Sequence, residues 1–225
     1  MDRTSLTRRL IHYQSSIEKL SGYLLKAKHQ LINGDIAAYQ KTTQAAAWEA
    51  EKLTRSLRDL TFQTACSSKK DAMLRAADAL QIAIVQEERW VKITLPALLP
   101  HRKEGQSSAF LVDPLRYALT DFVKADEIHP LERGAVCVRY LYREDYPERW
   151  YRDHDNIECK QVLDAVLDKL LVDDTGSRCL NLYQTAKSPQ EATEIFVMPV
   201  ENLTEWVKVY VGQGADDLQK QASEF

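Results

Sequence analysis

The chain has 225 residues, a formal net charge of -3, 44% hydrophobic residues and 28% charged residues. This composition is ordinary for a globular protein, and the length allows one or two domains. No apolar run approaches the roughly 18 residues that a membrane span needs. The amino terminus lacks the apolar core and small-residue cleavage site of a secretory signal. We therefore expect a soluble, cytoplasmic protein without a membrane segment.

The cysteines and the distribution of charge further limit the class of protein that this chain can belong to. The four cysteines are scattered and none forms a C-x-x-C pair, so they indicate reduced thiols and neither a zinc site nor a disulfide framework. Residues 1 to 85 carry 13 Lys and Arg against 8 Asp and Glu, whereas the remainder has a net charge of -8. The acidic second half disfavours purely electrostatic binding of nucleic acid but allows an acidic metal site.

The first segment predicts a long helix with one apolar seam, because apolar residues recur at alternating steps of four and three. The seam consists of Leu6, Leu10, Tyr13, Ile17, Leu20, Leu24, Ala27 and Leu31. Asn33-Gly34-Asp35 then predicts a helix stop followed by a new N-cap. A second helix should follow at once and pack antiparallel on the first.

The second helix has its own seam of the same spacing, and a third helix is expected from about Asp71. The second seam comprises Ile36, Tyr39, Thr43, Ala46, Ala50, Leu53, Leu57 and Leu60, and the third Met73, Ala77, Leu80 and Ile84. These helices predict a three-helix bundle, or a coiled coil completed by a partner. The alternative is an arm that contacts DNA through Arg8, Arg9, Lys26, Lys28, Arg55 and Arg58.

From Trp90 onward the sequence predicts alternating strands and helices. Trp90 to Leu95 is β-rich, and Asp113-Pro114 is typical of a capped helix start. After Gly134, strict alternation predicts a strand with one apolar face, formed by Val136, Val138, Tyr140 and Tyr142. A helix stripe follows, with Leu163, Val166, Leu167 and Leu170 after a cap at Asp155 or Asn156.

Two shorter strands, over 178–185 and 193–198, and a terminal helix from Leu203 complete the expected fold. The fold class is therefore α+β: a helical bundle or coiled-coil hairpin over residues 1–87, an α/β domain over 88–211, and a tail over 212–225 that we expect to fray.

The informative polar cluster is acidic. Asp153 and Asp155 precede the predicted helix, and Asp173 and Asp174 follow it. Residues two apart in an extended segment point the same way, so the first pair can converge on one hard cation. Carboxylates, water and phosphate are typical ligands of Mg²⁺. Equally, these residues suit a capped helix and a turn at 173–176 with no metal.

A family resemblance adds to this interpretation. Ile93-Thr94-Leu95-Pro96 starts the domain, Asp153-His154-Asp155-Asn156 follows, and Lys160 and Asp164 stand four apart before Asp173-Asp174. This order resembles the RusA family of Holliday junction resolvases over about half the chain. Lys160 departs from the family pattern, because it stands four residues after Asn156 where three are usual.

The resemblance implies a homodimeric, Mg²⁺-dependent endodeoxyribonuclease of the crossover junction resolvase type, acting on branched DNA in recombination and repair. It implies that the metal ligands are Asp153, Asp155 and Asp174, and that the catalytic residues are these three and Lys160. For substrate binding we expect Arg143, Arg149, Arg152 and Asn156, since arginines interleaved with aromatic residues can hold phosphates and stack on bases.

Two other classes compete with the enzyme. One is a noncatalytic RusA-like protein that binds DNA or serves in assembly, because fold analogy does not establish catalysis. The other is an interaction protein in which the helical segment is active and the second domain is a scaffold. A twofold dimer would suit a symmetric junction.

Overall fold

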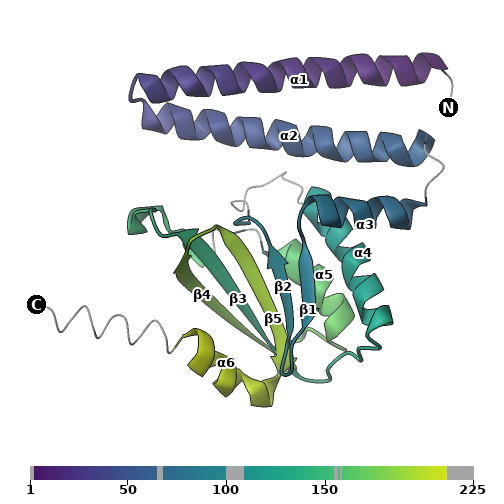
Figure 1. The fold of residues 1–225 in the computed structure, drawn as a ribbon, viewed down its shortest axis with the longest axis vertical. Helices are drawn as coiled ribbons and strands as arrows, with labels where there is room; N and C mark the ends of the chain where they lie inside the picture. The colour runs from purple at the N-terminus through teal and green to yellow at the C-terminus, as the bar shows by residue number, and fades with distance from the viewer. Residues whose placement is uncertain (1–2, 65–67, 100–108, 155–156, 158, 212–225) are drawn as a thin grey trace, which may run out of the picture. The chain divides into compact units, whose positions relative to one another are not determined.

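The structure is a computed structural model, and it describes residues 3–64, 68–99, 109–154, 157 and 159–211. The chain divides into two compact units, Met1–Ala72 and Met73–Phe225 (Figure 1). The first is helical and the second combines a mixed five-stranded sheet with helices, so the predicted α+β class is confirmed. Among the described helices, none is long and apolar enough to cross a membrane.

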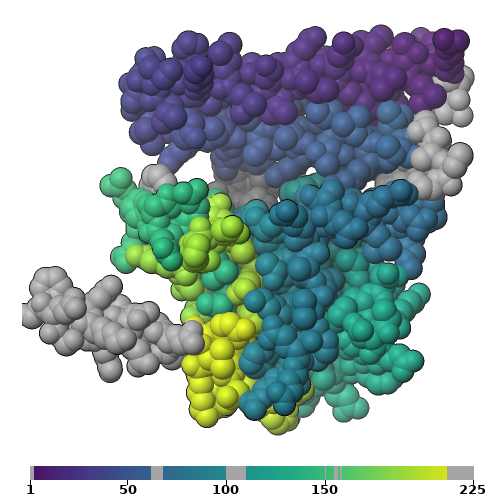
Figure 2. Space-filling view, viewed as in Figure 1, coloured from purple at the N-terminus to yellow at the C-terminus, as the bar shows by residue number. Residues whose placement is uncertain are grey.

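The first unit is an antiparallel hairpin of α1 (Arg3–Ile32) and α2 (Ile36–Thr64), which lie alongside each other (Figure 2). Gly34 adopts φ of +73° in the turn, and Asp35 accepts the Ala38 amide at 3.0 Å as the N-cap of α2. Between the helices, the Tyr13 hydroxyl donates to the Ser56 carbonyl at 3.2 Å. The predicted stop, cap and hairpin are confirmed.

The prediction of one apolar seam on α1 is wrong. Tyr13 and Ala27 are buried in the hairpin and Leu6 and Leu20 are half-buried, as a helix packed on one neighbour requires. The alternate members of the predicted seam are instead exposed to solvent, namely Leu10, Ile17, Leu24 and Leu31. The side of α1 that meets α2 also includes the half-buried Ser16 and Tyr23, so the contact line is rotated away from the predicted seam.

The third helix, α3 (Lys69–Ala79), ends before Ile84. Ile84 lies on strand β1 (Ala83–Gln86), and both Leu80 and Ile84 pack against the core of the sheet unit. The expected third helix of a bundle is therefore shorter than predicted, and its last two apolar residues serve the sheet.

The sheet has the order β1-β2-β5-β3-β4, with β2 (Val91–Leu95), β3 (Gly134–Arg143), β4 (Cys179–Ser188) and β5 (Ala192–Pro199). Among the described pairs of strands, β3 and β4 alone run parallel. Helices α4 (Ala109–Ala125) and α5 (Lys160–Leu170) contribute to the core on one face, which includes the predicted apolar face of β3. Helix α6 (Leu203–Tyr210) covers the other face with Trp206.

Two helix starts differ from prediction. Helix α4 begins at Ala109, so Pro114 lies inside it instead of at its first position. The N-cap of α5 is Cys159, whose side chain makes no capping hydrogen bond, and neither Asp155 nor Asn156 takes that place. Composition marks a helix near these positions, but the turn at which the helix starts depends on packing.

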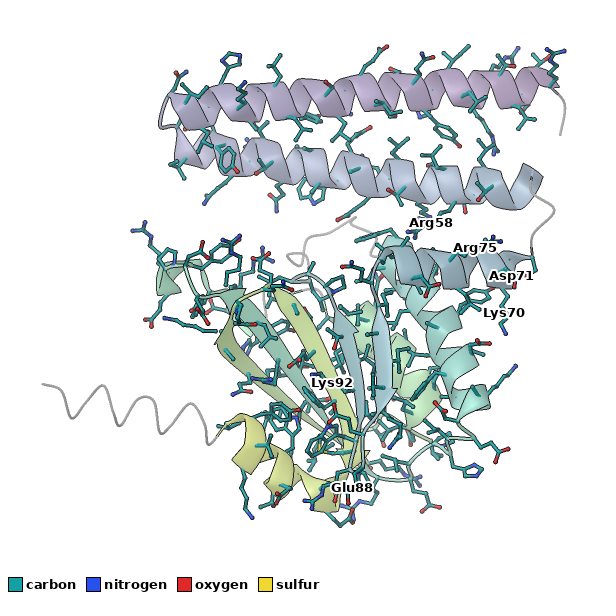
Figure 3. All side chains as sticks on the ribbon, viewed as in Figure 1. Arg58, Lys70, Asp71, Arg75, Glu88 and Lys92 are labelled. Atoms are coloured by element: carbon teal, nitrogen blue, oxygen red, sulfur yellow. The ribbon has the colours of Figure 1, made fainter. Side chains whose placement is uncertain are left out.

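A row of polar side chains crosses the α6 side of the sheet. The buried Glu194 carboxylate on β5 accepts hydrogen bonds from Arg139 Nη1 on β3 and pairs with Lys92 Nζ on β2, both at 2.7 Å. Lys92 is labelled in Figure 3. Arg139 also donates to Gln184 on β4 at 2.9 Å and stacks 4.6 Å from the centre of the Tyr210 ring. This row links four strands and α6.

Replacing Glu194 with Ala should lower the free energy of unfolding of the sheet unit by about 3 kcal/mol, because two cations would lose their shared partner in a largely buried setting. Urea unfolding followed by near-UV circular dichroism measures this. The exposed Glu201 provides a matched control, and Glu201→Ala should change stability by less than about 0.5 kcal/mol. Equal effects of both variants would contradict the assigned role of the row.

Gly22 and Gly34 should respond in opposite directions to alanine. Gly22 lies inside α1, and no atom comes within 4 Å of the position that a Cβ would occupy, so Gly22→Ala should stabilise the helix by about 1 kcal/mol. Gly34→Ala should destabilise by about 1 kcal/mol, because φ of +73° is unfavourable with a Cβ. Thermal unfolding followed by far-UV circular dichroism tests both. The same sign for the two would show that the turn is wrongly assigned.

Candidate functional site

The segment before α5 holds the first part of the predicted acidic site. Asp153 is exposed, whereas Asp155 and Asn156 lie outside the described residues. His154 is half-buried and shares a hydrogen bond of 3.0 Å between Nε2 and Thr185 Oγ1. Its ring also lies between those of Tyr140 and Tyr183, at 5.5 and 5.7 Å. His154 therefore joins the segment to β3 and β4, which is a structural role.

The same neighbourhood contains buried hydroxyls that sequence reasoning treated only as core. Tyr140 is fully buried, and its hydroxyl has no hydrogen-bond partner among the described residues. Burial, followed by the nearby Cys159 thiol, raises the pKa of Tyr183 to about 12, and the same two causes raise the pKa of Tyr140. Both phenols are therefore protonated at neutral pH and are poor proton acceptors.

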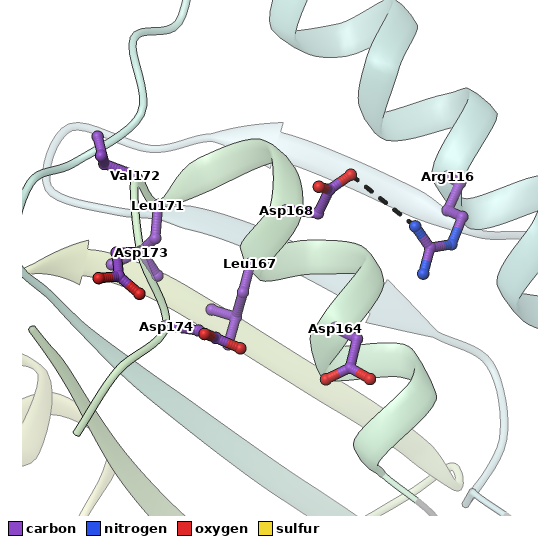
Figure 4. A pocket seen from close by; sticks show the side chains of 8 residues that line it. All are labelled: Arg116, Asp164, Leu167, Asp168, Leu171, Val172, Asp173 and Asp174. Atoms are coloured by element: carbon purple, nitrogen blue, oxygen red, sulfur yellow. Dashed lines mark ion pairs between the residues drawn. The ribbon is translucent and has the colours of Figure 1, made fainter.

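The carboxyl end of α5 and the loop after it line a hollow of about 400 Å³ (Figure 4). Four aspartates share it, but Asp153 and Lys160 are not among its lining residues. The four are Asp164, Asp168, Asp173 and Asp174. Asp164 in the middle of α5 and Asp174 after its end line the same hollow, while Lys160 lies at the exposed first turn.

Protein groups already engage two of these carboxylates. Asp168 pairs with Lys169 at 2.9 Å and Arg116 at 3.8 Å, and these cations, Lys169 first, lower its pKa. Asp173 accepts the amide of Thr175 at 3.1 Å, which is the local bond of an Asx turn. The interpretation of 173–176 as a turn thus accounts for Asp173 without a metal.

Within the described ranges, no group of three or more His, Cys, Asp or Glu side chains is placed to hold a metal ion. The predicted trio of Asp153, Asp155 and Asp174 includes a residue outside those ranges, so the trio stays a prediction. Asp174 does influence its surroundings, because its charge, after burial, contributes to the raised pKa of Cys179.

Two of the predicted substrate arginines bind other parts of the chain. Arg152 Nη1 donates to the Leu99 carbonyl at 2.8 Å. Arg143 makes a two-pronged contact with Asp145, at 3.0 and 2.7 Å. Arg149 is exposed in a short 3₁₀ helix, Glu148–Trp150. The three arginines therefore differ in whether another residue of the chain already occupies the guanidinium group. The sequence does not show this difference, because it depends on contacts in the folded chain.

A second candidate site lies on α1, where the sequence allowed a coiled coil completed by a partner but did not show which residues the hairpin leaves exposed. We define the α1 outer face as seven aliphatic residues whose exposed fractions run from 51% to 70%. They are Leu10, Ile11, Ile17, Leu24, Leu25, Leu31 and Ile32. Together they form roughly several hundred Å² of apolar surface, a size typical of interaction sites. Strict seven-residue spacing of Leu10, Ile17, Leu24 and Leu31 was the available signal.

Comparison with known proteins gives a family but no activity. Similar solved structures include the periplasmic domain of Helicobacter pylori MotB, with 14% identity, a TM-score of 0.31, and coverage of 59% of this chain and 88% of that chain. A putative MotB-like protein from Desulfovibrio vulgaris has 14% identity and a TM-score of 0.28, covering 65% and 99%. TM-scores this low support no inference about function. No curated protein matches.

These findings correct the predicted activity of a Mg²⁺-dependent endonuclease that resolves branched DNA. The family whose model matches has no known function, and neither of the similar structures named above is described as a nuclease. The prediction of a hydrolase that acts in DNA recombination and repair is corrected together with this activity. The RusA resemblance, the Mg²⁺ ion, the branched-DNA partner, the homodimer and the cytoplasmic location are tested by none of these findings and stay predictions.

The family match extends across both structural units. One family model covers residues 2–221, and therefore includes the hairpin as well as the sheet. The chain belongs to DUF6100, a family of unknown function.

Proposed function

We propose that this protein is an assembly protein that pairs with a second copy of itself through the α1 outer face. The observation that carries the proposal is the line of Leu10, Ile17, Leu24 and Leu31, each more than half exposed at seven-residue intervals. A heptad line of aliphatic residues is the pattern by which helices bury one another.

Among the described residues of the hairpin, no large aliphatic side chain is fully buried, although Leu6 and Leu20 are half-buried, and this supports the proposal. The buried residues of the hairpin include Tyr13, Ala27, Thr42 and Ala46, whose side chains are small, hydroxylated or phenolic. The seven aliphatic residues of the α1 outer face are larger than most of these and remain in water. Because burial of apolar surface supplies most helix stability in proteins, a second helix against this face would stabilise the hairpin.

The polar contacts that join α1 to α2 use side chains outside the α1 outer face. Lys19 Nζ lies 3.1 Å from Glu49 Oε2, and Lys52 reaches the same carboxylate at 3.4 Å. The hydrogen bond from Lys19 is the main cause that lowers the pKa of Glu49. These contacts fix α2 against one side of α1, so that a second copy can pack only on another side.

The native mass tests the proposal. The full-length chain should sediment at about twice its mass of 25.8 kDa at micromolar concentration. Substituting both Ile17 and Leu24 with Glu should weaken association roughly 100-fold or more, because two apolar contacts are replaced by buried charge. Analytical ultracentrifugation over a concentration series measures the change.

A matched control places the same charges on a different side of α1. Ser15 and His29 are exposed and do not belong to the α1 outer face, so the double change to Glu should leave the dimer intact. A wild-type chain that is monomeric at every concentration would overturn the proposal and point to cover from within the chain. Equal dissociation of both double variants would show that association does not depend on this face.

A further inference from the structure

We infer that the two α1 helices pair antiparallel about a twofold axis that passes near Ser21. This inference rests on the proposed self-association and specifies its geometry. The α1 outer face has two aliphatic edges: one formed by Leu10, Ile17, Leu24 and Leu31, the other by Ile11, Leu25 and Ile32. At 100° per residue, Gln14, Ser21 and Lys28 lie on the line between these edges. All three are exposed.

A parallel, in-register pair would oppose like charges. Lys28 would face Lys28 of the second copy in the middle of an apolar surface, and Glu18 would face Glu18 at its edge. The amino-terminal Arg3 would also lie beside its own copy. Each of these pairs brings like charges together, which is unfavourable.

The antiparallel pair removes these conflicts. Rotation about Ser21 places Gln14 opposite Lys28 of the second copy, so an amide oxygen can accept from the ammonium. The same rotation brings Leu10 opposite Ile32, Ile11 opposite Leu31, and Ile17 opposite Leu25, so that six of the seven aliphatic residues meet one another, while Leu24 lies opposite Glu18. Glu18 stands one turn from Gln14, roughly 6 Å along the axis, within reach of the same lysine.

The charges at the ends of α1 and the small residues at its centre also favour the antiparallel pair. In the antiparallel pair Arg8 comes level with residue 34 of the second copy, beside the carboxyl end of its α1, where helix carbonyls carry partial negative charge and Asp35 follows. At the centre, the short side chain of Ser21 lets the two backbones approach, and the adjacent Gly22 has open space around it. Small residues at a crossing permit close helix packing.

Disulfide trapping in the full-length chain tests the direction. Two single variants are made, Gln14→Cys and Lys28→Cys, and each is oxidised alone and in a one-to-one mixture. The antiparallel pair predicts a linked heterodimer in the mixture, about tenfold in excess over either linked homodimer, because only unlike positions come within disulfide range. Gln14 and its own copy would be roughly 21 Å apart.

The readout is mass spectrometry of the linked peptides, with oxidised wild type as the blank for the four native cysteines. Efficient homodimer links in each variant alone would overturn the antiparallel direction in favour of the parallel one, while the dimeric mass would still stand. A dimeric mass without links in any sample would overturn the assignment of Ser21 to the axis. A monomeric mass contradicts the underlying self-association and is recognised before any oxidation.

Discussion

The sheet depends on one buried carboxylate. Glu194 sits on β5 between the cations of β2 and β3, and through Arg139 it reaches β4 and Tyr210 of α6. A charge in this position is costly unless it is paired, so the pairing also specifies which strands are neighbours. The acidic hollow at the end of α5 lies on the opposite side of the sheet, with α4 and α5.

Periodicity predicted those elements whose environment is uniform along their length. β3 alternates because one face meets α4 and α5, and Val136 to Tyr142 made that face visible in the sequence. The spacing predicted the α1 helix equally well, but it did not predict which residues of α1 are covered by α2. Leu10 and Tyr13 satisfy the same spacing, yet one is exposed and the other is buried. Spacing measures the width of an apolar stripe and does not show which part is covered.

The candidate site shows the same limit for polar residues. Arg152 and Arg149 are similar in sequence context, but a carbonyl of a distant loop engages only Arg152. Asp173 and Asp174 are adjacent, and only the former closes a turn. Composition identifies carboxylates and arginines suited to metal and phosphate, whereas their availability depends on contacts between segments far apart in the chain.

The position of β5 within the sheet has a consequence for biosynthesis. This strand lies between β2 and β3, although it is the last strand to be made. During translation the sheet therefore stays open until residue 199 has left the ribosome, whereas the hairpin is complete some 135 residues earlier, at residue 64. Local helical contacts form quickly and amino-terminal segments fold first. The α1 outer face is thus available to a neighbouring nascent chain before either sheet exists.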